Sequence, residues 1–189
     1  GEEVPYRGML YATDRKPSEE DRVHYENQRG LLLRLGMAEV VLGGESLDWE
    51  EARRISLLKN RSAAYPLQVS AVHEFGVLDR SANDLIDPDL LPSDLEAAAA
   101  AFSQRVNAKL ALSRKKEILI YVHGYKVVFD NPVLVTTELW HFLGYDGVAI
   151  AFAWPSTPSR WAYFSDIETA SLSAFNLRML IEYLTEETD

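Results

Sequence analysis

The sequence predicts an α/β protein with a mostly parallel sheet and flanking helices. An uninterrupted apolar run, Ile118 to Val122, stops abruptly at His123, which is typical of a strand buried on both faces of a parallel sheet. Val148 to Trp154 is a second such run. Between them, Asn131-Pro132 offers a capping side chain before a proline, and Gly144 is a natural helix end. Strand, helix and strand in this order predict a crossover unit and hence the α/β class.

The N-terminal region predicts further strands. Met9 to Thr13 is short and half apolar, as an early strand is, whereas Asp14 to Arg29 is charged without a clear period and is interpreted as a long surface loop. Leu31 to Leu42 is expected to form one or two strands bounded by glycine turns, and Leu67 to Phe75 another strand. Four side chains here either line a pocket or are scattered over the surface: Tyr11, Arg15, Tyr25 and Arg29.

Capping boxes indicate two more helices. Asp48 with Glu51 has the spacing of a box that starts a helix over Trp49 to Leu58, and Ser93 with Glu96 has the same spacing. The helix after Ser93 is expected to pack one stripe on the sheet: Leu95, Ala99, Phe102, Val106 and Leu110. The last helix has a comparable predicted stripe: Ala170, Ala174, Leu177, Ile181 and Leu184.

Composition narrows the class of partner. With 29 acidic and 19 basic residues the formal net charge is −10, which disfavours nucleic acid and anionic membranes as partners. The absence of cysteine excludes disulfides, a thiolate nucleophile and cysteine-ligated metals. The sequence contains no phosphate-binding loop, no dinucleotide fingerprint and no metal-ligand cluster, so no cofactor or metal is expected.

The chain is expected to be one domain over residues 1–189, because this length suits a single sizeable core. No apolar run approaches the ~18 residues of a transmembrane helix, so the chain as given is expected to be soluble. It starts at Gly1 without methionine. We therefore expect that an upstream segment has been lost, and the compartment, cytoplasm or bacterial cell envelope, stays open.

His123, Gly124 and Tyr125 follow the first apolar strand directly. In open α/β sheets, ligands gather at the carboxyl ends of the strands, so this corner is the first candidate site. Three stretches here carry a resemblance to a known family: MLYATDR at Met9 to Arg15, YVHGYKVVFDN at Tyr121 to Asn131 and GYDGVAIAFAWPS at Gly144 to Ser156. The chain resembles the α/β-hydrolase superfamily, and within it uncharacterised bacterial esterase- and lipase-like proteins.

The resemblance implies a role for the HGY corner. In that superfamily a turn of this type donates backbone N–H groups to the oxyanion of an acyl-transfer intermediate, so Gly124 and Tyr125 would bracket the oxyanion hole. Glycine would let the substrate approach the backbone closely. The family's catalytic histidine lies near the C-terminus, so His123 is interpreted as a positioning residue in preference to a proton carrier.

Other residues near these strand ends are candidates for substrate contact. Tyr125 and the residues on its loop either touch substrate or pack the loop, and the aromatic side chains near the second strand, with Trp161, form either an acyl-pocket wall or a lid. The predicted substrate-binding residues are Lys126, Asp130, Trp154 and Ser156. His73 and Glu74 are neighbours on a strand and point to opposite faces, so they are not expected to form a dyad.

The sequence also departs from the superfamily pattern. A serine hydrolase of this type needs a G-x-S-x-G nucleophile elbow, and no serine here is flanked that way. In the family the elbow follows the helix that ends here near Leu184. We therefore expect the chain to be the N-terminal portion of a serine carboxylic-ester hydrolase acting on a small-molecule ester. It would carry the oxyanion-hole half of the site and be inactive alone. The alternative is a non-catalytic interaction or ligand-binding domain on a hydrolase scaffold.

The resemblance further predicts the strand order. In the family, the strand Ile118 to Val122 lies between the strand Val148 to Trp154 and the strand that carries the nucleophile. Without the latter, Ile118 to Val122 becomes a sheet edge whose unpaired backbone groups are a template for another chain. We therefore expect that the chain self-associates through this strand, exchanges its terminal helix between copies, or is ordered only together with the missing half as a separate piece.

Overall fold

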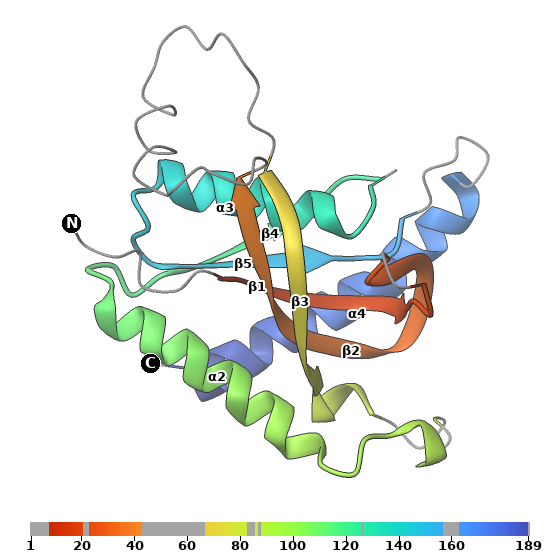
Figure 1. Cartoon of the computed structure of the whole chain (residues 1–189). Helices are drawn as coiled ribbons and strands as arrows, with labels where there is room; N and C mark the ends of the chain where they lie inside the picture. Colours follow the sequence, from red (N-terminus) through yellow and green to blue (C-terminus); the bar gives the residue numbers. More distant parts are fainter. Residues whose placement is uncertain are drawn as a thin grey trace, which may run out of the picture.

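The computed structural model describes residues 8–20, 23–42, 67–82, 86, 88–125, 127–156 and 163–188. They form a five-stranded sheet flanked by helices (Figure 1). The strands are β1 (Gly8–Pro17), β2 (Tyr25–Leu42), β3 (Leu67–Val77), β4 (Ile118–Val122) and β5 (Val148–Ala153). The helices are α2 (Leu95–Leu112), α3 (Asp130–Phe142) and α4 (Tyr163–Glu187), with short 3-10 turns at Asp79–Ser81 and Pro88–Leu90. The expected helix over Trp49 to Leu58 lies outside the described residues.

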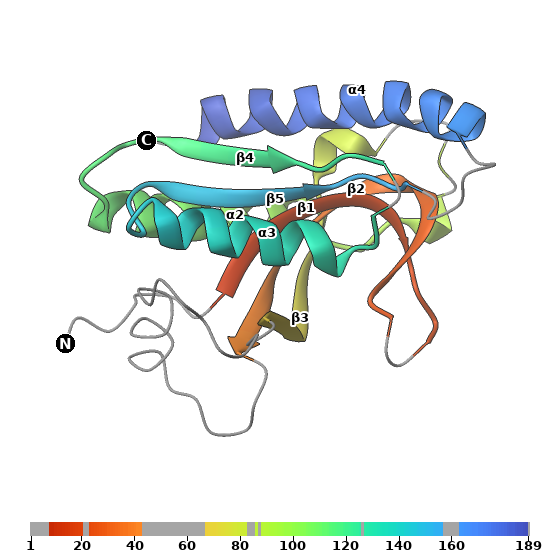
Figure 2. The ribbon, with the colours of Figure 1, turned by 90° about the horizontal axis from the view of Figure 1, so that it is seen from above.

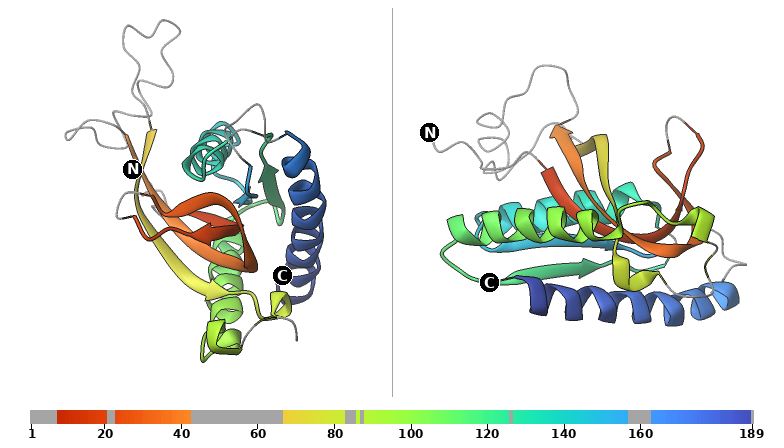
Figure 3. Two further views of the ribbon diagram at one scale, coloured as in Figure 1. Left: turned by 90° about the vertical axis from the view of Figure 1, so that its right-hand side faces the viewer. Right: turned by 90° about the horizontal axis from the view of Figure 1, so that it is seen from below.

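The sheet has the strand order β3-β2-β1-β5-β4. β1, β2 and β3 pair antiparallel, whereas β1, β5 and β4 pair parallel, so the sheet is mixed and its parallel part is confined to three strands. α3 covers one face, and α2 and α4 cover the other (Figures 2 and 3). The α/β class and the flanking helices are therefore confirmed, with a strand, helix and strand unit in β4, α3 and β5.

The two apolar runs differ in burial. β5 is buried at every position. β4 occupies the end of the strand order, and it leaves Leu119 and Val122 39% and 44% exposed. Burial of β4 on both faces was a wrong expectation, because the terminal strand has a neighbour on one side only. Its expected place beside β5 at the edge of the sheet is confirmed for the described residues.

The N-terminal region contains more strand than expected. Asp14 to Pro17 continue β1, and Tyr25 to Arg29 begin β2, so most of the expected surface loop is sheet. Asp14 and Arg15 are fully buried. The surface-loop interpretation was wrong because a charged stretch without periodicity is not always exposed. Its polar side chains can be buried when they form hydrogen bonds with distant segments.

Gly36 lies within β2 instead of bounding a turn. It pairs with Tyr11 of β1, and a Cβ on Gly36 would lie 2.4 Å from the Tyr11 hydroxyl oxygen and 2.6 Å from the His73 carbonyl oxygen. A glycine here therefore makes room for the tyrosine. The Tyr11 hydroxyl lies 2.7 Å from that of Tyr25, which donates to Glu74, so a polar network lies under α3.

The helix starts differ from the predicted caps by one residue or more. Asp94, not Ser93, caps α2 by accepting a hydrogen bond from the Ala97 N–H. α3 begins at Asp130 after Phe129, with no side-chain cap bond, so Asn131 does not act as its cap. The left-handed Gly144 (φ 73°) follows the end of α3 and donates to the His141 carbonyl, as predicted for a terminating glycine.

The buried stripe of α4 is rotated from the predicted one. Leu184 is buried and Leu177 is partly buried as predicted, but Ile181 is 46% exposed, and Ala170 and Ala174 face solvent. The inner face instead contains Ser173, Leu180 and Tyr183. Ser173 is polar but belongs to this face because its hydroxyl donates to buried Asp14. The spacing of apolar residues along the helix does not reveal such a contact.

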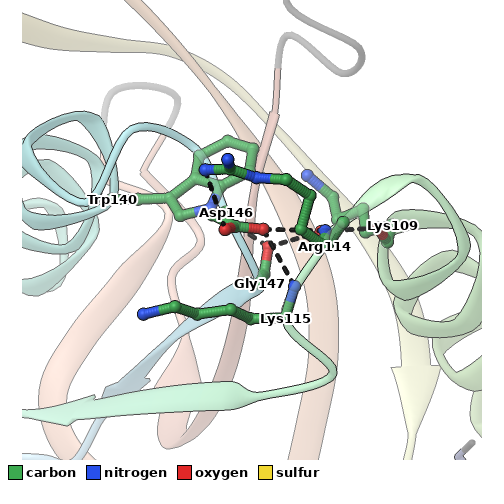
Figure 4. Close-up of polar contacts among 7 residues, drawn as sticks. Lys109, Arg114, Lys115, Trp140, Asp146 and Gly147 are labelled. Atoms are coloured by element: carbon green, nitrogen blue, oxygen red, sulfur yellow. Dashed lines mark hydrogen bonds and ion pairs between the residues drawn. The ribbon is translucent and has the colours of Figure 1, made fainter.

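The amino ends of β4 and β5 are joined by polar contacts (Figure 4). Asp146 Oδ1 accepts hydrogen bonds from the backbone N–H groups of Arg114 and Lys115, and the Gly147 carbonyl accepts from the Trp140 indole. Buried Lys109 lies over the Trp140 ring, with 4.5 Å between Nζ and the ring centroid, and burial lowers its pKa to about 8. This end of the sheet is therefore filled by structural contacts.

Candidate functional site

The carboxyl ends of β1, β5 and β4 meet at one edge of the sheet because the three strands are parallel. Thr13 is in register with Ala153, and Val122 with Phe152. The loop after β4, which contains the HGY corner, therefore begins beside the ends of β5 and β1 (Figure 2). This is the edge at which open α/β sheets bind ligands.

His123 and Trp154 form a locked pair at this edge. Their rings stack with centroids 5.3 Å apart and an interplanar angle of 5°. The Trp154 indole N–H donates to the His123 carbonyl oxygen at 2.7 Å, and His123 Nε2 lies 3.0 Å from the Trp154 carbonyl oxygen. These contacts fix the chain where it leaves β4.

The imidazole of His123 faces a carbonyl oxygen at each ring nitrogen. Nδ1 lies 2.5 Å from the Gly124 carbonyl oxygen, and Nε2 approaches that of Trp154. Burial nevertheless lowers the pKa of His123 to about 4, and the Arg15 charge acts in the same direction. The ring is therefore neutral at pH 7, and neither nitrogen is directed at solvent. This geometry supports a positioning role and gives His123 no free nitrogen for proton transfer.

Gly124 and Tyr125 project from this fixed point. Both are exposed, Tyr125 by 56%. A Cβ on Gly124 would find no heavy atom within 4 Å, and its φ lies outside the left-handed region. Neither packing nor backbone strain therefore demands a glycine here. The space beside Gly124 is open to a ligand.

The peptide at Val127 is held from two sides. Its N–H donates to Ser156 Oγ at 3.0 Å, and the same hydroxyl donates back to the Val127 carbonyl at 3.1 Å. The Arg15 Nη2 donates to that carbonyl at 2.6 Å. Arg15 and Ser156 are both fully buried.

β1 supplies two further buried polar side chains next to Arg15. Thr13 Oγ1 donates to the Ala153 carbonyl at 2.6 Å. Asp14 Oδ2 accepts from Ser173 Oγ at 2.7 Å and from Asn176 at 2.9 Å, both on α4. Burial raises the pKa of Asp14, and its Oδ1 has no hydrogen-bond partner among the described residues. Three consecutive residues thus contact β5, α4 and the loop after β4.

The predicted site residues are only partly brought together. His123, Gly124 and Trp154 are adjacent, and Ser156 lies beneath the loop with its hydroxyl bonded to Val127. Asp130 lies in the first turn of α3, where burial raises its pKa and the nearby His24 lowers it. Lys126 and Trp161 lie outside the described residues. Substrate contact by these residues stays a prediction.

Sequence reasoning missed the roles of Thr13 and Asp14, and left Arg15 between a pocket and the surface. The available signal was the MLYATDR stretch itself, where a polar triplet directly follows four nearly apolar positions of a strand. In the described part of the chain, no group of three histidine, aspartate or glutamate side chains is arranged to hold a metal ion. No helix among the same residues is both long and apolar enough to cross a membrane.

Comparison with known proteins identifies one family. The family model described as alpha/beta hydrolase of unknown function (DUF900) matches residues 98–189, which extend from within α2 to the end of the chain. The match includes the HGY corner and Ser156, but not the β1 residues 13–15. The comparisons with curated proteins and with solved structures gave no match. Residues 98–189 of the chain are therefore similar to an α/β-hydrolase family whose function is unknown.

Proposed function

We propose that the HGY corner is the oxyanion-binding part of a serine carboxylic-ester hydrolase site. The observation that carries the proposal is the open space beside Gly124, where a Cβ would contact nothing although the adjacent His123 is buried and locked. A glycine that the fold does not require is best explained by a ligand that approaches the backbone. The family match supports only the coarser part of the proposal, a hydrolase-type fold over residues 98–189.

The chemistry follows from the charge that develops during acyl transfer. When a nucleophile attacks the ester carbonyl, the carbonyl oxygen becomes an oxyanion, and preorganised N–H donors stabilise it. The backbone N–H groups at Gly124 and Tyr125 would be these donors. The stacked, neutral His123 would hold the turn without carrying a proton, and the exposed Tyr125 ring would contact the acyl or alcohol group.

The nucleophile would not be a serine of these 189 residues, because no G-x-S-x-G elbow is present. Treatment of the chain with a fluorophosphonate probe is therefore expected to leave it unlabelled. Stoichiometric labelling of any of its serines would contradict this part of the proposal. An oxyanion hole without its triad contributes little residual rate, so ester hydrolysis by the chain alone is expected to be very slow.

The main test uses the full-length product of the gene and a panel of short-chain p-nitrophenyl esters. Gly124→Val is expected to lower kcat by roughly 10²-fold or more, because a side chain in this space would keep the ester carbonyl away from the backbone donors, and loss of one oxyanion donor has that effect. Stability should be unchanged, since a side chain at position 124 meets open space. The matched control is Ala111→Val at an exposed position of α2, which should keep both activity and stability.

Two outcomes would overturn the assignment. Wild-type turnover in a folded Gly124→Val protein would remove the corner from the mechanism. A full-length product that hydrolyses no ester would leave the hydrolase scaffold as an interaction or ligand-binding domain.

A further inference from the structure

Arg15 is a buried cation whose contacts join the start of β2 to the loop after β4. It is fully buried, and its guanidinium donates to the Glu26 carbonyl at 3.3 Å and to Asn27 Oδ1 at 2.8 Å, both at the start of β2. It also donates to the Val127 carbonyl on the loop between β4 and α3. Removing a guanidinium from water is costly, so a chain that keeps one here must gain from its hydrogen bonds.

The backbone of Arg15 is itself anchored. Its N–H donates to Thr13 Oγ1 at 3.2 Å, and that hydroxyl donates to the Ala153 carbonyl of β5. The pairing of β1 with β2 shifts register between Thr13 and Arg15, a local irregularity of the kind that redirects a side chain at the end of a strand. The guanidinium therefore extends from a fixed point on the central sheet.

We propose that Arg15 is a positioning residue for the HGY corner. Gly124 and Tyr125 lie between two fixed points, His123 held by Trp154 and Val127 held by Arg15 and Ser156. With both ends of this short segment held, the two backbone N–H groups keep one orientation. A planar guanidinium with two forked Nη groups suits this task, since it serves acceptors on β2 and on the loop after β4 at once.

The catalytic consequence rests on the proposed function, whereas the effect on loop order does not. The first test therefore measures order in the 189-residue chain itself, by amide hydrogen exchange and by the NMR shifts of the Gly124 and Tyr125 amides. Arg15→Met keeps the apolar stem and removes the donors. Asn27→Ala keeps the guanidinium but removes one acceptor that orients it.

The expected result is a fall of about tenfold or more in the exchange protection of the Val127 amide in Arg15→Met, the scale of one charge-assisted hydrogen bond. The Gly124 and Tyr125 signals should shift or broaden. Asn27→Ala should change the same signals in the same direction and by less. The matched control is Arg34→Met, which removes a half-buried ion pair with Glu74 on β2 and β3 and should leave all three amides unchanged.

Unchanged Val127 protection in folded Arg15→Met would overturn the proposal. If Arg15→Met does not fold, Asn27→Ala decides, and unchanged shifts at Gly124 and Tyr125 in that variant would equally overturn it. In the full-length gene product, Asn27→Ala should lower kcat with little change in KM when the rate is expressed per folded enzyme, with the folded fraction measured separately by urea denaturation. Loss of loop order without any ester hydrolysis by the wild type would refute the proposed function and leave the positioning role intact.

Discussion

The neutral state of His123 makes the stability of this protein depend on pH. The imidazole is buried, and its pKa is lowered from 6.5 to about 4 in the folded protein. In the unfolded chain the same group titrates near 6.5. Between these values the unfolded state binds a proton that the folded state does not. Stability contributed by the neutral ring is therefore present above pH 6.5 and is lost as the pH falls toward 4.

The size of the effect follows from the two pKa values. One pKa unit corresponds to about 1.4 kcal/mol, so acidification from pH 7 to pH 4 should remove about 3 kcal/mol of the free energy of unfolding through His123 alone. At pH 5 the loss should be about 2 kcal/mol. Natural domains have total stabilities of only about 5–15 kcal/mol, so the effect is easily measured.

The measurement is urea denaturation of the wild type and of His123→Gln at pH 7 and pH 5. Gln retains an amide nitrogen to donate toward the Trp154 carbonyl but does not titrate. Buried Asp14 and Asp130, whose pKa values are raised, stabilise the fold at low pH and act against His123, but they do so in both proteins. The variant should therefore lose about 2 kcal/mol less than the wild type. Equal losses in the two proteins would refute the reasoning.

Two further predictions concern stability. Gly36→Ala should lower the free energy of unfolding by roughly 1–3 kcal/mol, because the added Cβ overpacks against the Tyr11 hydroxyl. Gly124→Ala should leave the free energy of unfolding unchanged, because its Cβ meets open space. Urea denaturation compares the two variants, and equal stabilities would contradict the expectation. Asp146→Asn should weaken the contacts of the turn between α2 and β4, since the backbone N–H groups of Lys115 and Arg114 lower the pKa of this carboxyl. The stability difference between wild type and Asp146→Asn should be present above about pH 4 and disappear as the pH falls further; thermal melts at several pH values check it, and a difference independent of pH would contradict it.

The sequence was most informative where a local pattern determines the structure. The apolar runs of β4 and β5 predicted both strands, because a run of five or six apolar residues that includes β-branched and aromatic side chains is typical of a core strand. Gly144 predicted the end of α3 for an equally local reason, its left-handed backbone. The degree of burial was predicted less well, since it depends on which strands are neighbours: β4 is half-exposed at the end of the sheet.

The corner of the site was predictable, but its support was not. His123 and Gly124 are marked by their place after an apolar strand, whereas the role of Arg15 depends on the Val127 carbonyl, 112 residues away. Asp14 likewise bonds to side chains of α4 more than 150 residues later. From sequence alone, a charged residue at a strand end is expected to be exposed to solvent, because its buried hydrogen-bond partner cannot be identified. Pattern reasoning therefore assigned these side chains to a loop.

The free edge of β4 remains the best candidate for an interaction between copies. Within the described sheet β4 pairs with β5 alone, and it exposes Leu119 and Val122. Unpaired N–H and C=O groups beside apolar side chains are a template for strand pairing. Arg114 to Lys116 precede the strand, so parallel pairing of two copies would bring these positive charges together. Antiparallel pairing about a two-fold axis keeps them at opposite ends and leaves one closed dimer.

We therefore propose that the chain self-associates through β4, giving a dimer of twice the 21.4 kDa monomer mass in native mass spectrometry. Leu119→Lys places a charge on the edge and should shift the population to monomer, since charged side chains on an edge strand oppose further pairing. The matched control is Val41→Lys, which changes a similarly exposed residue (43%) on β2, a strand with neighbours on both sides, and should leave the dimer intact. Amide hydrogen exchange locates the dimer contact. Dimerisation through β4 should protect amides between Ile118 and Val122 that exchange freely in Leu119→Lys. A stable monomer in which these amides are already protected would show that the edge is covered by another part of the molecule, and a dimer that survives Leu119→Lys would place the contact elsewhere.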